Sequence, residues 1–313
     1  MHQMKRIPPL AAIAALCASF PLLAQEAKTY PAPSEIVAAA KADEWVAIAP
    51  SDLLVMDLAP DSKAKPRRVV IQLMPAPFSQ GWVGNIRKLA AAAWWDGTSI
   101  NRVQDNYVVQ WGDATEKKAL PNGLAVVSEG DYVFPQGLKR SHALDPIFIP
   151  PNNIIRWTSF HQGFPVAGVG SPDTASNWPI HCYAMVGVGR NLSPDTGTGA
   201  ELYTVIGHAP RHLDRNIALV GRVIEGIEHM SSLPRGTGAL GFYETAEERV
   251  PILSVRLGND VKGVPAFEYL NTDSASFAAY ADARANRRDP FFNVPAGGAD
   301  ICNIPVPIRR KAK

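Results

Sequence analysis

Residues 94–113, WWDGTSINRVQDNYVVQWGD, place one arginine just ahead of an apolar segment. Segment 107–111 is typical of a strand, and an arginine is seldom fully buried without a partner. Arg102 therefore either covers the surface or points into a pocket where its charge is used. A guanidinium is always charged and offers several fixed donors, so it suits electrostatic stabilisation without a nucleophile. Gln110 adds an amide donor and acceptor to the same stretch.

Other familiar chemical patterns point elsewhere. The sequence contains neither a G-x-S-x-G turn nor an H-E-x-x-H helix, which disfavours the corresponding hydrolases and metalloproteases. His208 and His212 are four residues apart, but Pro210 opposes a helix between them and no third ligand is evident. Residues 236–241, GTGALG, match a dinucleotide pattern without its strand-turn-helix context. The sequence thus predicts neither a metal nor an organic cofactor.

The segments that must position these side chains are mostly extended. A helix is predicted over 80–94, after Ser79, because apolar residues recur there at helical spacing. A short second helix is predicted near 227–233, where Pro234 stops it. Strand character marks segments 44–59, 67–74, 107–111, 181–189, 200–207, 217–226 and 250–260. Many short strands with two helices favour a mainly β fold, a closed or nearly closed antiparallel barrel.

The predicted barrel domain is expected to span residues 45–262. Segments with a weaker sequence pattern interrupt it and follow it. Residues 114–180 are rich in turn formers, with 146–160 the one expected strand, and suggest an insertion that covers or borders a site. Residues 263–313 are expected to form a C-terminal extension. A helix is predicted there over 267–280, followed by irregular chain.

The first residues are typical of an exported protein. In residues 1–24 two positive charges precede an uncharged run that prolines interrupt, which predicts a signal peptide cleaved after Ala24. A lipoprotein would need a small residue before Cys17, where a leucine stands. Residues 25–44 then form an expected linker with a short helix at 34–42. A periplasmic location follows from this interpretation.

Charge and hydropathy limit the partners. The chain has 31 Lys and Arg against 29 Asp and Glu, and loss of residues 1–24 leaves 29 of each. A neutral protein lacks the basic character expected of a nucleic-acid-binding body. No later segment approaches about 18 uncharged apolar residues, so we expect no stable membrane insertion after cleavage.

Two cysteines remain after the signal peptide, Cys182 and Cys302. In an oxidising compartment they can pair, which would close a loop of about 120 residues. Two buried free thiols would give the same sequence, so both alternatives stay open.

The order of these segments resembles that of the cyclophilins, the cyclosporin-type peptidyl-prolyl isomerases, over about residues 45–260. The family signature runs aromatic, His, Arg, Val, a short spacer, aromatic, two residues, Gln, Gly, Gly, Asp. Here it reads Ile100, Asn101, Arg102, Val103, Tyr107, Gln110, Trp111, Gly112 and Asp113. The resemblance implies an eight-stranded antiparallel barrel capped by two helices, with a substrate groove on one outer face.

The resemblance also implies roles for individual residues. Arg102 matches the catalytic electrostatic group and Gln110 the residue that holds the substrate backbone. The proline pocket would consist of Tyr107, Val108, Tyr203 and Leu213, with further substrate contacts from Val186, Gly187, Glu201 and His212. Tyr107 and Gln110 are three positions apart, so a bulge or twist is needed for both to reach one groove. The alternative for these residues is ordinary barrel packing, with Arg102 lying over it.

Several positions depart from the family pattern. The usual histidine before the arginine is Asn101, and the usual Gln-Phe-Phe is Glu201-Leu202-Tyr203. The usual Met-Ala-Asn is Met185-Val186-Gly187, a tryptophan is His212 and a groove histidine is Ile217. Glu201 could hold Arg102 through a charge-assisted bond or neutralise it. Loss of the indole N–H and its apolar face predicts weak cyclosporin binding.

The sequence therefore predicts an exported peptidyl-prolyl cis-trans isomerase without cofactors that acts on proline-containing polypeptides. The alternative is a non-catalytic peptide-binding or chaperone module on the same fold. The substitutions in the groove and the long insertion motivate that alternative.

Overall fold

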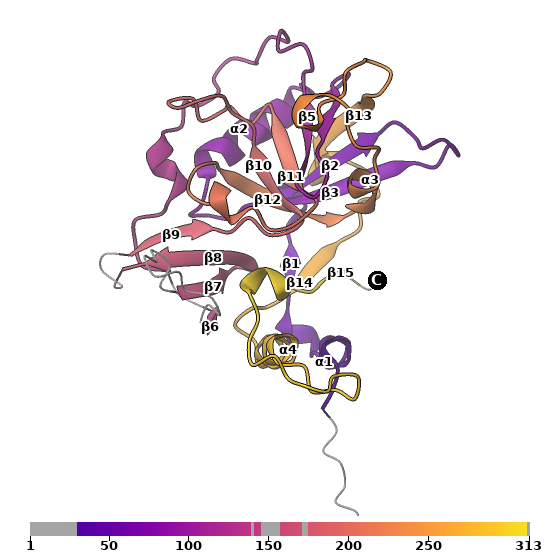
Figure 1. Ribbon diagram of the computed structural model, residues 1–313. Helices are drawn as coiled ribbons and strands as arrows, with labels where there is room; N and C mark the ends of the chain where they lie inside the picture. The colour runs from indigo at the N-terminus through magenta and orange to yellow at the C-terminus, as the bar shows by residue number, and fades with distance from the viewer. Residues whose placement is uncertain (1–29, 139–140, 145–156, 171–174, 312–313) are drawn as a thin grey trace, which may run out of the picture.

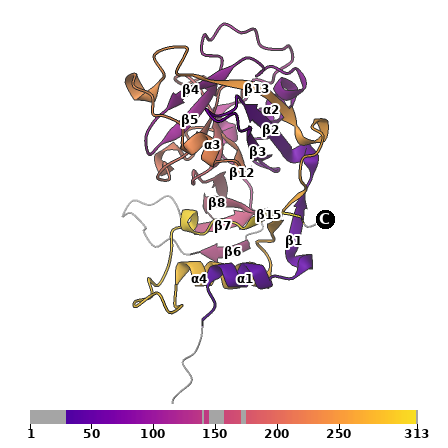
Figure 2. The same ribbon diagram turned by 90° about the vertical axis from the view of Figure 1, so that its right-hand side faces the viewer.

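The computed structural model describes residues 30–138, 141–144, 157–170 and 175–311. The predicted signal peptide and its cleavage site lie outside these residues. The described chain forms three tiers, with a barrel at one end, a four-stranded sheet in the middle and two helices at the other end (Figures 1 and 2). None of its helices is long and apolar enough to cross a membrane.

A closed antiparallel barrel of eight strands forms the first tier. Its strand order is β10-β11-β5-β4-β13-β2-β3-β12. In chain order these strands are β2 (Leu53–Leu58), β3 (Arg67–Leu73), β4 (Ser99–Val103), β5 (Val108–Gly112), β10 (Met185–Val188), β11 (Leu202–Val205), β12 (Leu219–Glu225) and β13 (Val250–Leu257). The predicted mainly β fold and eight-stranded barrel are confirmed.

Helix α2 (Gln80–Ala91) covers the barrel. Trp82, Ile86 and Leu89 are fully buried, because their helical spacing places them on one face. The helix is shorter than the predicted 80–94: Ala93 takes a left-handed φ of 51° and the amide of Trp94 donates back to the Leu89 carbonyl. Ser79 precedes the helix, but its side chain makes no capping hydrogen bond. The second expected helix is one turn, α3 (Glu228–Ser231).

Both ends of the described chain build a separate tier. Strand β1 (Trp45–Ile48) pairs with β14 (Phe267–Leu270), and β14 pairs with β15 (Ile308–Arg310). Helix α1 (Pro33–Ala39) packs against α4 (Ala275–Ala285), so the segment predicted to be a linker is structured where it is described. The barrel itself begins at β2.

Two element predictions fail in this tier. The segment read as one strand, residues 44–59, is divided by a 3-10 turn over Pro50–Asp52, so that β1 and β2 belong to different sheets. The helix predicted over 267–280 is wrong in its first part, where β14 pairs with two strands. The helix starts only after Ser274, whose hydroxyl accepts from the Phe277 amide.

The insertion is more ordered than predicted. It forms a four-stranded sheet of β6 (Ser141–Leu144), β7 (Trp157–His161), β8 (Phe164–Val169) and β9 (Ser176–Pro179). The single strand expected over 146–160 is described only from residue 157, where it is β7. The β7–β8 hairpin turns at Gln162 and Gly163, both with positive φ, as two-residue hairpin turns require.

The insertion sheet lies between the barrel and α4. On one face, Phe160 packs edge-on against Phe277 of α4, with ring centroids 5.0 Å apart. On the other face, Arg222 of β12 lies over the Phe164 ring at 4.4 Å and donates to the Gly163 carbonyl and to Gln72. Burial lowers the pKa of Arg222 to about 9. A buried cation with these acceptors fixes the sheet onto the barrel.

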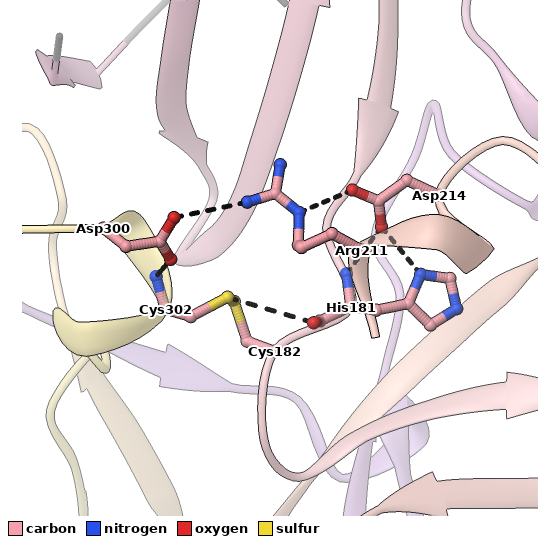
Figure 3. The surroundings of a disulfide bond; sticks show 6 residues. All are labelled: His181, Cys182, Arg211, Asp214, Asp300 and Cys302. Atoms are coloured by element: carbon pink, nitrogen blue, oxygen red, sulfur yellow. Dashed lines mark hydrogen bonds and ion pairs between the residues drawn. A yellow bond between two sulfur atoms is a disulfide. The ribbon is translucent and has the colours of Figure 1, made fainter. Parts of the chain in front are cut away.

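A disulfide joins Cys182, just after β9, to Cys302 in the C-terminal extension (Figure 3). Of the two alternatives that the sequence left open, the structure therefore contains the pair. Cys302 lies in a 3-10 turn, Ile301–Asn303. The Asp300 side chain caps this turn by accepting from the Cys302 backbone amide. The extension is thus tied to the chain that leads into barrel strand β10.

Candidate active site

Arg102 lies on β4 opposite Gln110 of β5. The strand register shifts between Ile100 and Arg102, so Asn101 is passed over in the pairing. The Asn101 amide instead donates to the Gly112 carbonyl at 3.2 Å. The irregularity expected in this motif is therefore present, and it lies in β4.

Tyr107 reaches the groove in a different way. It precedes β5 in the tight β4–β5 connection, where its amide donates to the Gln104 carbonyl at 3.3 Å. Its carbonyl accepts from Ile206 at 2.9 Å. Because Tyr107 stands outside the regular strand, strict alternation with Gln110 does not apply to it.

The guanidinium of Arg102 is half-buried and held by three acceptors. Its Nε donates to the Leu240 carbonyl at 2.8 Å, Nη1 to Gln110 Oε1 at 3.2 Å, and Nη2 to Gln104 Oε1. It also lies 5.7 Å from the ring centroid of Tyr107 and 5.3 Å from that of Phe242. Burial lowers the pKa of Arg102 from its ordinary value. The charge is therefore presented in one fixed orientation.

Gln110 stands between Arg102 and Glu201. Its Oε1 accepts from Arg102, and its Nε2 lies 3.5 Å from Glu201 Oε2. Among the described residues no hydrogen bond or ion pair joins Glu201 to Arg102. Glu201 therefore neither holds nor neutralises Arg102 by direct contact. The carboxylate acts on the arginine only through the Gln110 amide.

Glu201 is a half-buried ionisable group that lines a hollow. Burial raises the pKa of its carboxyl to about 7, against a partial lowering by Gln110. The nearby carboxylates of Glu116 and Asp113 add to the rise. Gly112 leaves room beside it, because a Cβ at that position would overlap the Glu201 carboxylate unless that side chain moved.

Glu201→Gln is expected to change the pH dependence of stability. The folded-state pKa of about 7 lies above the ordinary 4.5, so the stability due to protonated Glu201 is complete below about pH 4.5. That stability is lost as pH rises through 7, when a buried carboxylate forms. Urea unfolding should show the variant more stable than the parent by about 1–3 kcal/mol at pH 8, with little difference at pH 4.5.

The exposed Glu244 supplies the matched control. Glu244→Gln should leave the pH dependence of the unfolding midpoint close to that of the parent. If the unfolding free energies of the parent and Glu201→Gln changed in parallel with pH, Glu201 would have an ordinary pKa in the folded protein.

A small apolar cluster lies beside Arg102 on the barrel. Val108, Tyr203 and Val205 are buried, and Tyr107, Leu213 and Ile217 pack against them. The structure thus brings together the four residues that the sequence assigned to the proline pocket. Val205, two positions after Tyr203 on the same face of β11, could have been added by strand alternation.

Of the other residues predicted to contact substrate, Gly187 and His212 lie beside the apolar cluster, whereas Val186 does not. Gly187 pairs with Tyr203, whose ring lies where a side chain at 187 would be. Val186 is fully buried with the barrel core, so its side chain does not line the groove. His212 is exposed and stacks on Tyr107, with ring centroids 6.2 Å apart.

Two adjoining hollows lie near the Arg102–Gln110 pair and the apolar cluster. One of about 400 Å³ is lined by Gln110 and Glu201 among others, and one of about 700 Å³ by Leu213 and Ile217. Arg190 and Asn191 line both.

No metal site is found in the described parts of the chain, where no three His, Cys, Asp or Glu side chains gather as ligands. His208 lies in a loop, and His212 follows in a 3-10 turn over Arg211–Leu213, so they share no helix face. Gln104, Leu240 and Phe242 contact Arg102 but were not singled out in the sequence. Of these three, only Gln104 could have been found from the sequence, because it lies two positions after Arg102.

Residues 64–257 match the family model of the cyclophilin type peptidyl-prolyl cis-trans isomerases. The chain belongs to this family. Among curated proteins, none matches the chain. It is similar to the crystal structure of cyclophilin AquaCyp293 from Hirschia baltica, with 21% identity and a TM-score of 0.64, over 86% of this chain and 95% of that one.

A cyclophilin type isomerase from Cryptosporidium parvum, crystallised with the dipeptide Ala-Pro, is a more distant match. It shares 10% identity and a TM-score of 0.36, over 65% of this chain and 98% of that one. The Hirschia match supports the barrel fold described above.

Proposed function

We propose that this protein accelerates cis-trans rotation about X-Pro bonds in exported polypeptides, with Arg102 stabilising the twisted bond. The observation that carries the proposal is the placement of Arg102. Its fixed guanidinium lies 5.7 Å from the Tyr107 ring, beside the apolar cluster of Val108, Tyr203 and Leu213. A proline ring in that cluster would bring its nitrogen within reach of the charge.

The chemistry requires no nucleophile. Rotation about an X-Pro bond is slow because amide resonance opposes it, with a barrier of about 18–20 kcal/mol. As the bond twists, the lone pair of the proline nitrogen becomes available to a hydrogen-bond donor. A donor aimed at that nitrogen stabilises the twisted state more than either planar state, which is the condition for catalysis. The partial burial of Arg102 strengthens this interaction.

Gln110 is suited to hold the substrate backbone. Because Arg102 donates to its Oε1, the amide is oriented with Nε2 toward Glu201. That N–H₂ group is a donor that a substrate carbonyl can share or take over, since the bond to Glu201 is long at 3.5 Å. The peptide would then be fixed on both sides of the rotating bond.

The exported location rests on two observations. Residues 1–24 have the charge and hydropathy of a signal peptide. The disulfide between Cys182 and Cys302 is of a kind that persists in oxidising compartments. We therefore place the polypeptide substrates among exported or envelope proteins.

One observation favours the non-catalytic alternative, a peptide-binding module on the same fold. All three guanidinium nitrogens of Arg102 already have acceptors, namely Leu240, Gln104 and Gln110. If these bonds persisted with peptide bound, only the second N–H of Nη1 and of Nη2 would remain, and the arginine would not reach the proline nitrogen unless one of these two pointed into the pocket.

NMR exchange spectroscopy on a proline tetrapeptide separates the two functions. The parent protein should bind the peptide and accelerate exchange between its cis and trans signals. Leu213→Asp, which puts a charge into the pocket, should lower the acceleration at least tenfold by excluding the proline ring. Leu253→Asp changes a leucine on β13 that is 55% exposed and outside the cluster, and should behave like the parent.

Peptide binding by the parent without accelerated exchange would favour the non-catalytic module. Acceleration that survives Leu213→Asp unchanged would move the site away from this cluster.

A further inference from the structure

A buried histidine that the sequence did not single out joins two elements of the pocket. His181 follows β9 and is 1% exposed. Its Nε2 lies 2.8 Å from the hydroxyl of Tyr203 on β11, and its Nδ1 lies 2.8 Å from Asp214 Oδ1. Its backbone amide donates to the same carboxylate oxygen at 3.0 Å. One imidazole thus contacts both β11 and the turn that ends at Asp214.

That turn presents pocket residues. Asp214 directly follows the 3-10 turn Arg211–Leu213, which carries Leu213 into the apolar cluster and His212 onto the Tyr107 ring. Arg211 Nε donates to the second oxygen of Asp214 at 2.7 Å. The turn is therefore held at its end by a carboxylate whose two oxygens both have partners.

The proton positions follow from the partners. Asp214 Oδ1 accepts from the His181 backbone amide and Oδ2 from Arg211, so the carboxylate also accepts from Nδ1 of His181. In the neutral ring Nε2 then accepts from the Tyr203 hydroxyl. Burial raises the pKa of Tyr203 well above its ordinary value, so the hydroxyl keeps its proton. The two rings lie nearly parallel, at 8°.

The C-terminal extension holds this arrangement from outside. Cys182, next to His181, is bonded to Cys302, and Arg211 also contacts Asp300 at 3.5 Å (Figure 3). Asp300 in turn accepts from the Cys302 amide at 2.9 Å. The extension is therefore attached at both the histidine and the turn.

The hydroxyl of Tyr203 explains why a polar partner is needed here. It is the polar atom of a side chain that is 4% exposed and packs among valines, and a buried hydroxyl without a partner is costly. Gly187 leaves room for it, because a Cβ there would overlap the phenol. The substitution of phenylalanine by tyrosine in this groove thus fits with a glycine opposite and a histidine behind.

We propose that His181 is a positioning residue for the prolyl site, setting the spacing between Tyr203 and the Arg211–Leu213 turn through its two ring nitrogens. The inference rests on the proposed function, because it concerns the pocket for the proline ring. His181 lies behind that pocket and touches no substrate. Loosening the spacing weakens binding of the planar and twisted states alike, so KM should rise while kcat stays nearly constant.

Two substitutions each retain one of the two hydrogen bonds that the His181 ring makes. In His181→Asn the side-chain nitrogen can replace Nδ1 and keep the bond to Asp214, but the bond to Tyr203 is lost. In His181→Gln the longer amide can replace Nε2 and keep Tyr203, but the bond from the ring to Asp214 is lost. Each should raise KM about three- to tenfold, the value of one buried hydrogen bond, with kcat within about twofold.

Tyr203→Phe completes the test, because it removes only the hydroxyl. Alone, it should raise KM, and it should add nothing further to His181→Asn, where the same bond is already absent. Combined with His181→Gln, it should raise KM again. A purely structural role for His181 would give additive changes in all combinations. His229→Asn, on α3, is the matched control and should leave KM unchanged.

Direct titration of a proline tetrapeptide separates this inference from the proposed function. If the parent binds the peptide without accelerating exchange, the proposed catalysis fails. The His181 and Tyr203 variants should then show in Kd the changes predicted above for KM. If the parent is active and His181→Asn folds with an unchanged KM and Kd, the inference alone is overturned. If His181→Asn does not fold, an unchanged KM and Kd in Tyr203→Phe overturns it.

Discussion

Arg102→Ala is expected to reduce isomerase turnover on a proline tetrapeptide at least tenfold, with the barrel intact. Removal of a charged donor from a partly buried site costs about 1.5–3 kcal/mol of transition-state stabilisation, and about 1.4 kcal/mol corresponds to tenfold. The side chain is half-buried and its partners lie at the groove surface, so the fold should survive. Exchange spectroscopy and a thermal unfolding curve would measure the two effects.

A second variant tests the geometry as well as the charge. Arg102→Lys keeps the positive charge but lacks the planar group that reaches Leu240, Gln104 and Gln110 together. Turnover should therefore fall in Arg102→Lys too, though less than in the alanine variant.

Arg235 provides a control of similar type near the groove. It forms an exposed ion pair with Asp105 in the β4–β5 connection, at 2.9 Å. Arg235→Ala should retain the parent's turnover, because an exposed pair of this kind contributes little. Turnover that is unchanged in Arg102→Ala would remove the catalytic assignment of Arg102.

Loss of the disulfide is expected to have the largest effect on stability. The Cys182–Cys302 bond spans 120 residues, and in the chain-entropy model a crosslink over such a loop contributes about 3–5 kcal/mol. The double variant Cys182→Ala with Cys302→Ala avoids a free thiol. Its unfolding free energy from a urea titration should be lower by about that amount.

Reduction of the parent protein provides the comparison for this variant. The reduced parent and the double alanine variant should unfold at similar urea concentrations, because both lose the same crosslink. A double variant within about 1 kcal/mol of the oxidised parent would mean that noncovalent contacts of the extension, such as Arg211 with Asp300, already hold it in place.

Much of the barrel and of the groove could be predicted from local sequence. The spacing of Trp82, Ile86 and Leu89 predicts the helix, and strand character predicts β5, but β4, which carries Arg102, was not among the predicted strands. These signals are short-range, because alternation and helical periodicity show which face each residue occupies. The four residues that the resemblance to the cyclophilins assigned to the pocket meet in one cluster.

Other features depended on pairings between distant segments, which no local pattern encodes. The segment 44–59 looks like one strand, yet Trp45 pairs with Leu270 and the barrel starts only at Leu53. The insertion looked irregular because its strands contain Pro165 and Gly168, whose neighbours in the sheet stabilise them. Strand formation there is decided by tertiary packing and not by propensity.

The sequence by itself indicated most strands of the barrel, because strand alternation is a property of neighbouring residues, and its resemblance to the cyclophilins pointed to Arg102 and the apolar pocket residues. Only the tertiary structure decided the partners of the polar side chains. It interposed Gln110 between Arg102 and Glu201, and it placed His181 between Tyr203 and Asp214. Hydrogen-bond partners of buried groups come from any part of the chain that the fold brings within about 3 Å.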